Sequence, residues 1–113
     1  MNIEDLRSHC LAFPNTTEGV KWEHNLCFML FEKIFLLVRL EEEPTGMTFK
    51  IAPDNFNDMA AKDGFEQAPY FAKGQWLYLD DITKVSEKEL KLIIQTSYDL
   101  IKSKLPKKLQ VLC

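Results

Sequence analysis

The sequence has very few of the residues from which metal sites are built. Its 113 residues include 2 histidines and 3 cysteines, and the cysteines lack the C-x-x-C spacing of zinc and redox motifs. His9 and Cys10 are adjacent, so on a helix they would point about 100° apart, while His24 and Cys27 stand at the start of an expected strand. A metal site needs several such ligands converging at about 2 Å from one ion. We therefore expect no metal site and no cofactor.

The local signatures of catalysis are also missing. The chain contains no G-x-S-x-G, P-loop or G-x-G-x-x-G motif, which removes the usual anchors of acyl-transfer, phosphoryl-transfer and dinucleotide chemistry. The adjacent pair Asp80-Asp81 would face opposite sides of a strand and is more typical of a turn. The three acids at Glu41–Glu43 are interpreted as a solvated connection. We expect a protein that is not an enzyme.

Long apolar runs and a signal sequence are absent. The apolar segments 27–31 and 34–38 are interrupted by Glu32 and Lys33, and both are far shorter than the roughly 20 residues that cross a bilayer. The first five residues carry two acids and are not followed by an apolar stretch, unlike a signal peptide. An odd number of cysteines fits a reducing compartment. We expect a cytoplasmic protein with no membrane partner.

Positive charge is scarce overall but concentrated at one place. The net charge is −3 and there are only two arginines, Arg7 and Arg39. Residues 102–108 nevertheless hold four lysines and no acid. Lys102 and Lys104 suit a helix C-terminus, where cations are favoured, whereas Lys107 and Lys108 follow Pro106 and need another explanation. The chain is predicted to carry a local cationic end on an acidic body.

Length and hydrophobic pattern predict one α+β domain over residues 1–113. Helical spacing of apolar residues indicates a first helix from Ile3 to Phe13, capped by Asn2, followed by a polar connection through residues 16–19. Segments 26–31 and 34–40 indicate a hairpin with a Glu32-Lys33 turn. Residues 47–51 alternate like a half-buried strand.

The second half of the chain repeats this alternation of helix and strands. Pro53 suits the first turn of a helix that Gly64 stops. Tyr70-Phe71 and 76–79 indicate a second hairpin around the tip 72–75. Ser86 and Glu89 suggest the capped start of a long helix that ends at Pro106. The predicted order is α-β-β-β-α-β-β-α, with an antiparallel sheet covered by helices on one face.

An ordered series of short features along the chain resembles the MmcQ/YjbR family of small bacterial proteins. The features are Phe13-Pro14, Lys33-Ile34-Phe35, Lys50 followed by Pro53, Tyr70 with Lys73 and Trp76, Ser97-Tyr98, and Leu105-Pro106-Lys107-Lys108. The resemblance implies a CyaY-like fold. It also implies a proposed role in DNA binding through two projecting hairpins, a "double wing", which here would be the turns at Glu32-Lys33 and 72–75.

The resemblance and the lysine pattern together suggest candidate DNA contacts. Lysines would neutralise phosphates, and an aromatic ring would stack on an exposed base or pack on a sugar, unless it covers the sheet. The candidates are Lys33, Lys50, Tyr70, Lys73, Trp76, Lys104, Lys107 and Lys108. The hypothesis is a monomer or homodimer that binds DNA weakly and largely without sequence preference. The alternative is a protein-interaction or adaptor domain, with no nucleic-acid role, that uses the sheet face left uncovered by helices.

Overall fold

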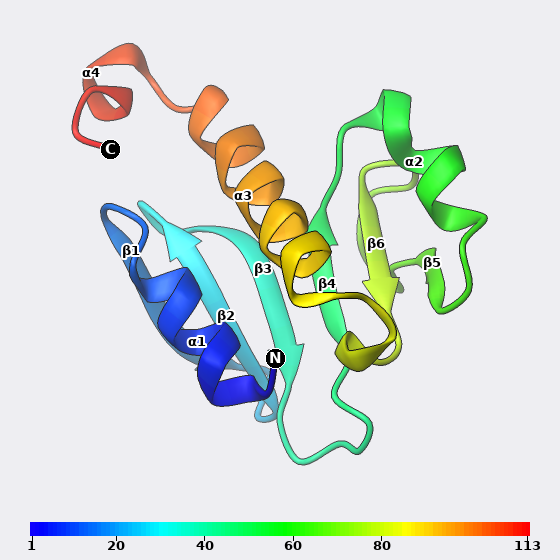
Figure 1. Ribbon diagram of the computed structural model, residues 1–113. Helices are drawn as coiled ribbons and strands as arrows, with labels where there is room; N and C mark the ends of the chain where they lie inside the picture. The colour runs from blue at the N-terminus through cyan, green and yellow to red at the C-terminus, as the bar shows by residue number, and fades with distance from the viewer.

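One sheet of six antiparallel strands organises the computed structural model, which describes residues 1–113 (Figure 1). The strands are β1 (Thr16–Lys21), β2 (Asn25–Leu30), β3 (Lys33–Arg39), β4 (Met47–Lys50), β5 (Phe65–Gln67) and β6 (Trp76–Leu79). The helices are α1 (Ile3–Leu11), α2 (Pro53–Ala60), α3 (Glu87–Ser103) and the short α4 (Lys107–Gln110), with a 3-10 turn, η1, at Ile82–Lys84.

The strands are ordered β1-β2-β3-β4-β6-β5 across the sheet. Helix α3 crosses β3 and β4, α1 lies by β1, and α2 packs beside β5 and β6 (Figure 1). The opposite sheet face is left without a crossing helix. The predicted fold class, an antiparallel sheet covered by helices on one face, is confirmed.

The main core lies between the sheet and α3. Strand register places Phe28, Leu36, Phe49 and Leu77 in one row across four strands. All four side chains are buried. Helix α3 supplies the facing apolar side, with Leu90, Ile93, Ile94, Tyr98 and Ile101. This is the helical stripe that the sequence predicted, and Ser86 caps the helix by accepting a hydrogen bond from the Glu89 N–H at 3.1 Å.

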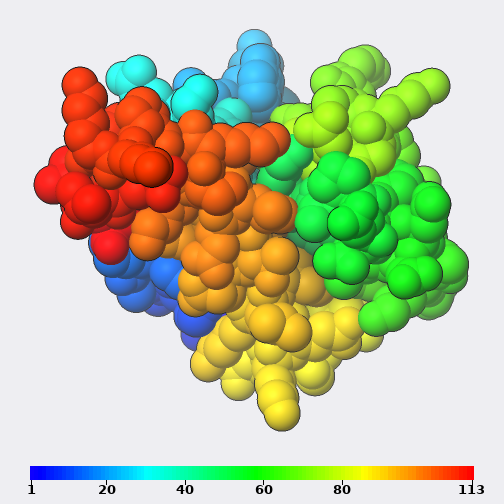
Figure 2. Space-filling view, turned by 90° about the horizontal axis from the view of Figure 1, so that it is seen from above, coloured from blue at the N-terminus to red at the C-terminus, as the bar shows by residue number.

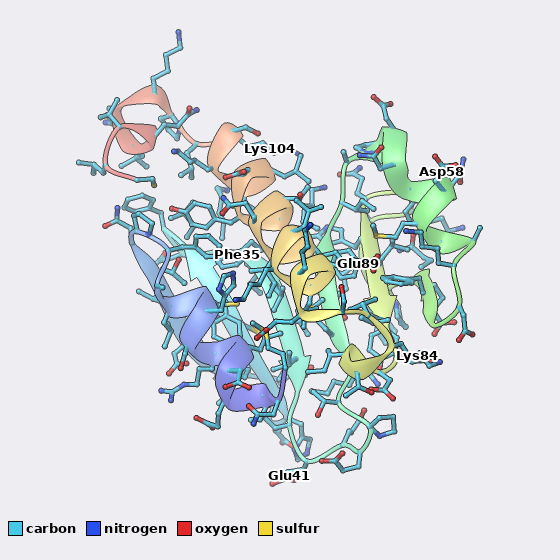
Figure 3. All side chains as sticks on the ribbon, in the orientation of Figure 1. Phe35, Glu41, Asp58, Lys84, Glu89 and Lys104 are labelled. Carbon is cyan, nitrogen blue, oxygen red and sulfur yellow. The ribbon has the colours of Figure 1, made fainter.

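A β-bulge sends one additional aromatic residue into this core. Phe28 pairs with Leu36 while Met29 pairs with Ile34, so Phe35 has no partner on β2. Both Phe35 and Leu36 therefore reach the core, although neighbours on a regular strand face opposite sides. Figure 3 shows Phe35 between the sheet and the helices.

Phe35 joins an aromatic cluster that connects the segment after α1 to the long helix α3. Its ring centroid lies 5.5 Å from that of Tyr98 and 6.5 Å from that of Phe13, both edge-on. Phe13 stacks on Tyr98 at 4.7 Å. The Tyr98 hydroxyl donates a hydrogen bond of 2.8 Å to the carbonyl of Pro14. The segment that follows α1 is thus fixed to α3 through β3.

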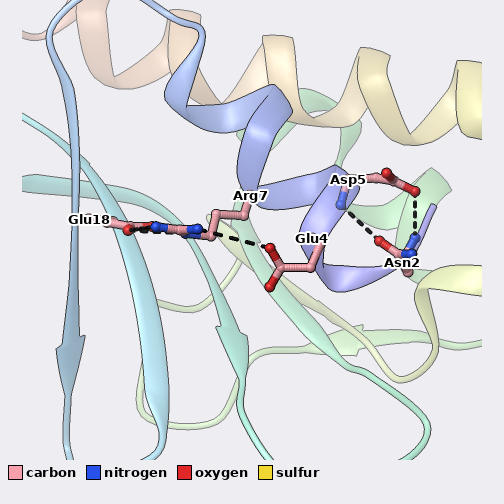
Figure 4. A network of polar contacts seen from close by, with 5 residues as sticks. All are labelled: Asn2, Glu4, Asp5, Arg7 and Glu18. Atoms are coloured by element: carbon pink, nitrogen blue, oxygen red, sulfur yellow. Dashed lines mark hydrogen bonds and ion pairs between the residues drawn. The ribbon is translucent and has the colours of Figure 1, made fainter.

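Helix α1 has a capping box at its N-terminus, formed by Asn2 and Asp5 and shown in Figure 4. Asn2 accepts a hydrogen bond from the Asp5 N–H at 2.8 Å, and the Asp5 carboxylate accepts one from the Asn2 N–H at 3.3 Å. The predicted cap at Asn2 is confirmed. Arg7 then reaches β1 and donates to both carboxylate oxygens of Glu18, with contacts of 2.6 to 3.1 Å.

Strand β1 was not predicted, because residues 16–19 were interpreted as a polar connection. The structure pairs Thr16 with Leu30 and continues to Lys21 with Asn25. An edge strand needs only one neighbour, and the sequence Thr-Thr-Glu-Gly-Val-Lys has no apolar alternation to reveal it. The observed order therefore contains one strand more than the predicted order.

The predicted Glu32-Lys33 turn is wrong by one residue. The turn is Phe31-Glu32, and both residues have positive φ, 47° and 68°, as a two-residue hairpin turn of type I′ requires. Lys33 is the first residue of β3. The apolar Phe31 concealed the turn, because it continues the apolar pattern of β2.

The second hairpin is also displaced. Its strands are β5 and β6, and the predicted strand at Tyr70-Phe71 belongs instead to the connection, residues 68–75. Gln67 organises this loop: its amide group donates to the carbonyls of Ala68, Phe71 and Ala72 and accepts from the Gly74 N–H. A single side chain thus replaces the backbone ladder that a tight hairpin would have.

The burial of β4 and the end of α3 also differ from the predictions. Strand β4 is fully buried rather than half-buried, since even Thr48 and Lys50 are covered. Helix α3 ends at Ser103, with Lys104 as its C-cap, before Pro106. Pro106 then precedes the short helix α4, because its fixed φ suits a helix start as well as a helix stop.

Candidate nucleic-acid interface and sheet-face cavity

Five of the predicted lysines lie at one end of the molecule, which we call the lysine end. They come from the start of β3, the 68–75 loop, the C-cap of α3 and α4, and all five are exposed: Lys33, Lys73, Lys104, Lys107 and Lys108. The segments that carry them all lie toward the upper end of the sheet in Figure 1, spread from α4 on one side to the 68–75 loop on the other. Figure 2, seen from above, shows the same segments on one surface, and Figure 3 labels Lys104 there.

None of these five lysines forms an ion pair. The basic partners in the salt bridges of the protein are Arg7, His24, Arg39, Lys62 and Lys84. Acids are present at the margins, with Glu32 in the β2–β3 turn and Asp58 on α2 (Figure 3). The charge of the lysine end is therefore not neutralised within the protein.

Lys50 behaves differently from the other candidate lysines. It is buried, and its Nζ donates a hydrogen bond of 2.8 Å to the side chain of Gln75 and lies 5.6 Å from the ring centroid of Trp76. Burial lowers the pKa of Lys50, and the positive charge of Lys104 lowers it further. Lys50 holds the base of the 68–75 loop rather than presenting its amine to solvent.

The two candidate aromatic residues, Tyr70 in the 68–75 loop and Trp76 at the start of β6, point to different surroundings. Trp76 is half-buried and packs against Phe71, with ring centroids 4.9 Å apart. Tyr70 is fully exposed and has a left-handed backbone, with φ of 68°. Tyr70 lies at the rim of a cavity on the uncovered sheet face rather than at the lysine end. The structure therefore distributes the predicted residues over two surfaces.

The cavity on the uncovered sheet face has a volume of about 680 Å³. Leu37 of β3 and Thr48 of β4, which are paired in register, line it from the sheet. The β1–β2 turn contributes Trp22, and the 68–75 loop contributes Tyr70 and Phe71 from another part of the chain. A volume of this size is typical of sites for small organic ligands.

Sequence reasoning did not find this cavity. Arg39, its main cation, is predicted to do no more than contribute charge, and Trp22 lies between the predicted connection at 16–19 and the predicted strand at 26–31, where no prediction falls. A tryptophan between charged residues in a polar turn was the available signal, since exposed aromatic residues are uncommon without a partner.

No group of three or more His, Cys, Asp or Glu side chains is arranged to hold a metal ion. None of the helices has the length and apolar character needed to span a bilayer.

The fold and the comparisons define a class of small α+β domains built on a helix-covered antiparallel sheet. A structure from Deinococcus radiodurans, with the domain DUF419, superposes with a TM-score of 0.88 over 97% of this chain and 86% of that chain, at 19% identity. A Pseudomonas syringae protein superposes with a TM-score of 0.74 over 88% of this chain and 98% of that one, at 17% identity. No curated protein matches.

The family model YjbR matches residues 11–100, and the chain belongs to the YjbR family. This confirms the resemblance drawn from the sequence. The match includes the Phe13-Pro14, Tyr70 to Trp76 and Ser97-Tyr98 features, and it ends before the lysines of α4.

Proposed function

We propose that the protein binds DNA through the lysine end. The observation that carries the proposal is the gathering of five exposed lysines without ion pairs from four separate parts of the chain. Each can release a counterion by contacting a phosphate. The β2–β3 turn and the 68–75 loop, which would act as the two wings, both lie at this end (Figure 1).

The chemistry of the lysine end favours binding to the DNA backbone over reading of bases. Arginine is the side chain that most often reads guanine, by a bidentate contact. Arg7 is held by Glu18, and Arg39 lies on the uncovered sheet face. Lysines alone contact phosphates as point charges. The proposed binding is therefore weak and largely independent of sequence, without a catalytic role.

The test is a salt series of binding to mixed-sequence duplex and single-stranded DNA. At about 50 mM salt we expect the double variant Lys73→Glu/Lys107→Glu to bind at least about 10-fold more weakly than wild type. The slope of log K against log salt should fall by about 2, one for each lost phosphate contact. Fluorescence anisotropy measures both quantities.

A charge-matched control separates local contacts from net charge. Lys88→Glu/Lys91→Glu makes the same change in charge at two exposed lysines near the start of α3. It should keep most of the affinity. Absence of wild-type binding at about 50 mM salt, or equal losses in the two double variants, would contradict the proposal. The first outcome would favour the protein-interaction alternative.

A further inference from the structure

The cavity on the uncovered sheet face has two exposed aromatic residues on its rim, Trp22 and Tyr70, and the backbone of Tyr70 is in an unfavourable conformation. Trp22 is 64% exposed and Tyr70 is fully exposed. Tyr70 has a positive φ of 68° outside any hairpin turn, which side chains of this size rarely adopt, whereas the positive φ of Trp22, 51°, belongs to the tight β1–β2 turn. Trp22 comes from the β1–β2 turn and Tyr70 from the loop between β5 and β6. Two exposed aromatic rings from separate parts of the chain thus meet at one cavity, and strained backbone such as that of Tyr70 clusters at binding sites.

The cavity also contains a cation whose hydrogen-bonding capacity is unused. The Arg39 guanidinium lies 5.0 Å from the ring centroid of Tyr78. Its nearest carboxylate, that of Glu42, is 3.7 Å away, which is longer than a hydrogen bond. Arg39 can therefore donate a pair of hydrogen bonds to a planar anion without breaking an internal one.

Gly46 is needed for this placement of Arg39. A Cβ atom at position 46 would overlap the hydroxyl of Tyr78, so only glycine leaves room for the ring. Tyr78 in turn supports the guanidinium from below through a cation–π contact. Arg39 is thus oriented by the packing around it.

The charges near Arg39 restrict the kind of anion that fits. Glu42 lies beside the guanidinium, and Glu23 and Glu41 each lie 3.8 Å from the His24 ring at the same end of the cavity. These carboxylates would repel a dianionic phosphate more strongly than a single carboxylate. The aromatic rim and the Leu37 side chain provide surfaces for a flat apolar ring.

We propose that this cavity binds a small aromatic monocarboxylate. The ring of the ligand lies over Leu37 between Trp22 and Tyr70, and its carboxylate accepts two hydrogen bonds from Arg39. Asn25, which pairs with Arg39 in the strand register, lines the cavity next to this carboxylate position. The proposal does not depend on DNA binding, because none of the five exposed lysines lines the cavity.

The test uses 2-naphthoate as the probe, with calorimetry for affinity and amide NMR spectra for location. Wild type should bind one equivalent saturably, and the Trp22 indole signal should shift. Arg39→Gln should weaken binding about 10-fold or more, because it removes a charge-assisted pair of hydrogen bonds. Tyr70→Ala, at a fully exposed position that does not support the fold, should weaken it about 5-fold.

The controls distinguish this site from general apolar binding and from the lysine end. The neutral analogue 2-naphthalenemethanol should bind at least about 10-fold more weakly to wild type. Leu92→Ala, at an exposed position on α3, and Lys107→Glu/Lys108→Glu, on α4, should both leave the naphthoate affinity unchanged. Equal affinity for the alcohol and the acid, or unchanged affinity in a folded Arg39→Gln variant, would overturn the proposal.

Discussion

Phe35→Ala is expected to lower the free energy of unfolding by about 3–5 kcal/mol, the range for removing a buried phenylalanine. Phe35 is fully buried, and its ring contacts both Phe13 and Tyr98. Removal of the ring leaves a cavity between Phe13 and Tyr98, which adds to the lost transfer free energy. Urea unfolding followed by circular dichroism measures the change.

Two variants make the result specific. Phe35→Leu keeps most of the apolar volume and should cost less than about 1.5 kcal/mol. Phe56→Ala removes the same atoms from a half-exposed position on α2 and should cost clearly less than Phe35→Ala. If Phe35→Ala and Phe56→Ala cost the same, the bulge does not place Phe35 at the centre of the core as described.

Alkaline pH is expected to destabilise the protein through a buried thiol. Burial raises the pKa of Cys10 to about 12, whereas an unfolded chain gives a cysteine pKa of about 8.5 to 9. The folded state therefore keeps a proton that the unfolded state loses. The stability from this group is fully present below pH 8.5 and is lost as pH rises toward 12. At pH 10.5 the loss is about 2 kcal/mol.

The comparison of wild type with Cys10→Ala isolates this effect. Burial also raises the pKa of Cys27, Tyr78 and Tyr98, so wild type loses stability from several groups in the same pH range. The alanine variant starts less stable at pH 7 but should lose about 2 kcal/mol less between pH 8 and pH 10.5. Leu6→Ala, which removes a buried side chain of the same helix but no titratable group, is the control. Parallel pH profiles for wild type and Cys10→Ala, measured under reducing conditions, would refute the prediction.

The sequence predicted the helices and strands correctly where one face of the element is buried, because burial produces a regular spacing of apolar residues. Helix α3 carries apolar residues on one face over its whole length, and Asn2 and Ser86 are caps whose chemistry is local. The β2–β3 hairpin and β4 were predicted for the same reason, because their apolar residues lie on the sheet face that the helices cover. These elements carry a pattern that is visible in the local sequence, although β4 also pairs with the distant β6 and α3 packs on β3 and β4.

The errors fall where the stabilising contact leaves no periodic pattern in the local sequence. Strand β1 exists because β2 pairs with it, not because Thr16–Lys21 has a strand pattern of its own. The loop 68–75 depends on Gln67, a polar residue with no visible periodic signal. The burial of Lys50 follows from the position of Gln75 and Trp76 above it. No local pattern distinguishes that lysine from the exposed ones.

The candidate site was predictable in part for the same reason. Lys73 and Lys107 are recognisable as cations from the sequence, but their meeting at one end depends on the course of the strands. The cavity depends on the approach of Trp22 and Tyr70 to the same two strands, 48 positions apart in the chain. Such convergence follows from topology.

The bonds made by Gln67 give the 68–75 loop a role as a mechanical link. The Gln67 side-chain amide donates to the carbonyl of Phe71, which lines the cavity, and accepts from the N–H of Gly74, which is next to Lys73. One amide group thus joins the two parts of the loop. A ligand that shifts Tyr70 and Phe71 would therefore shift Lys73 as well. By thermodynamic reciprocity, DNA held at Lys73 would alter ligand affinity by the same factor by which the ligand alters DNA affinity. Gln67 would then set the strength of communication between two surfaces that it does not itself touch.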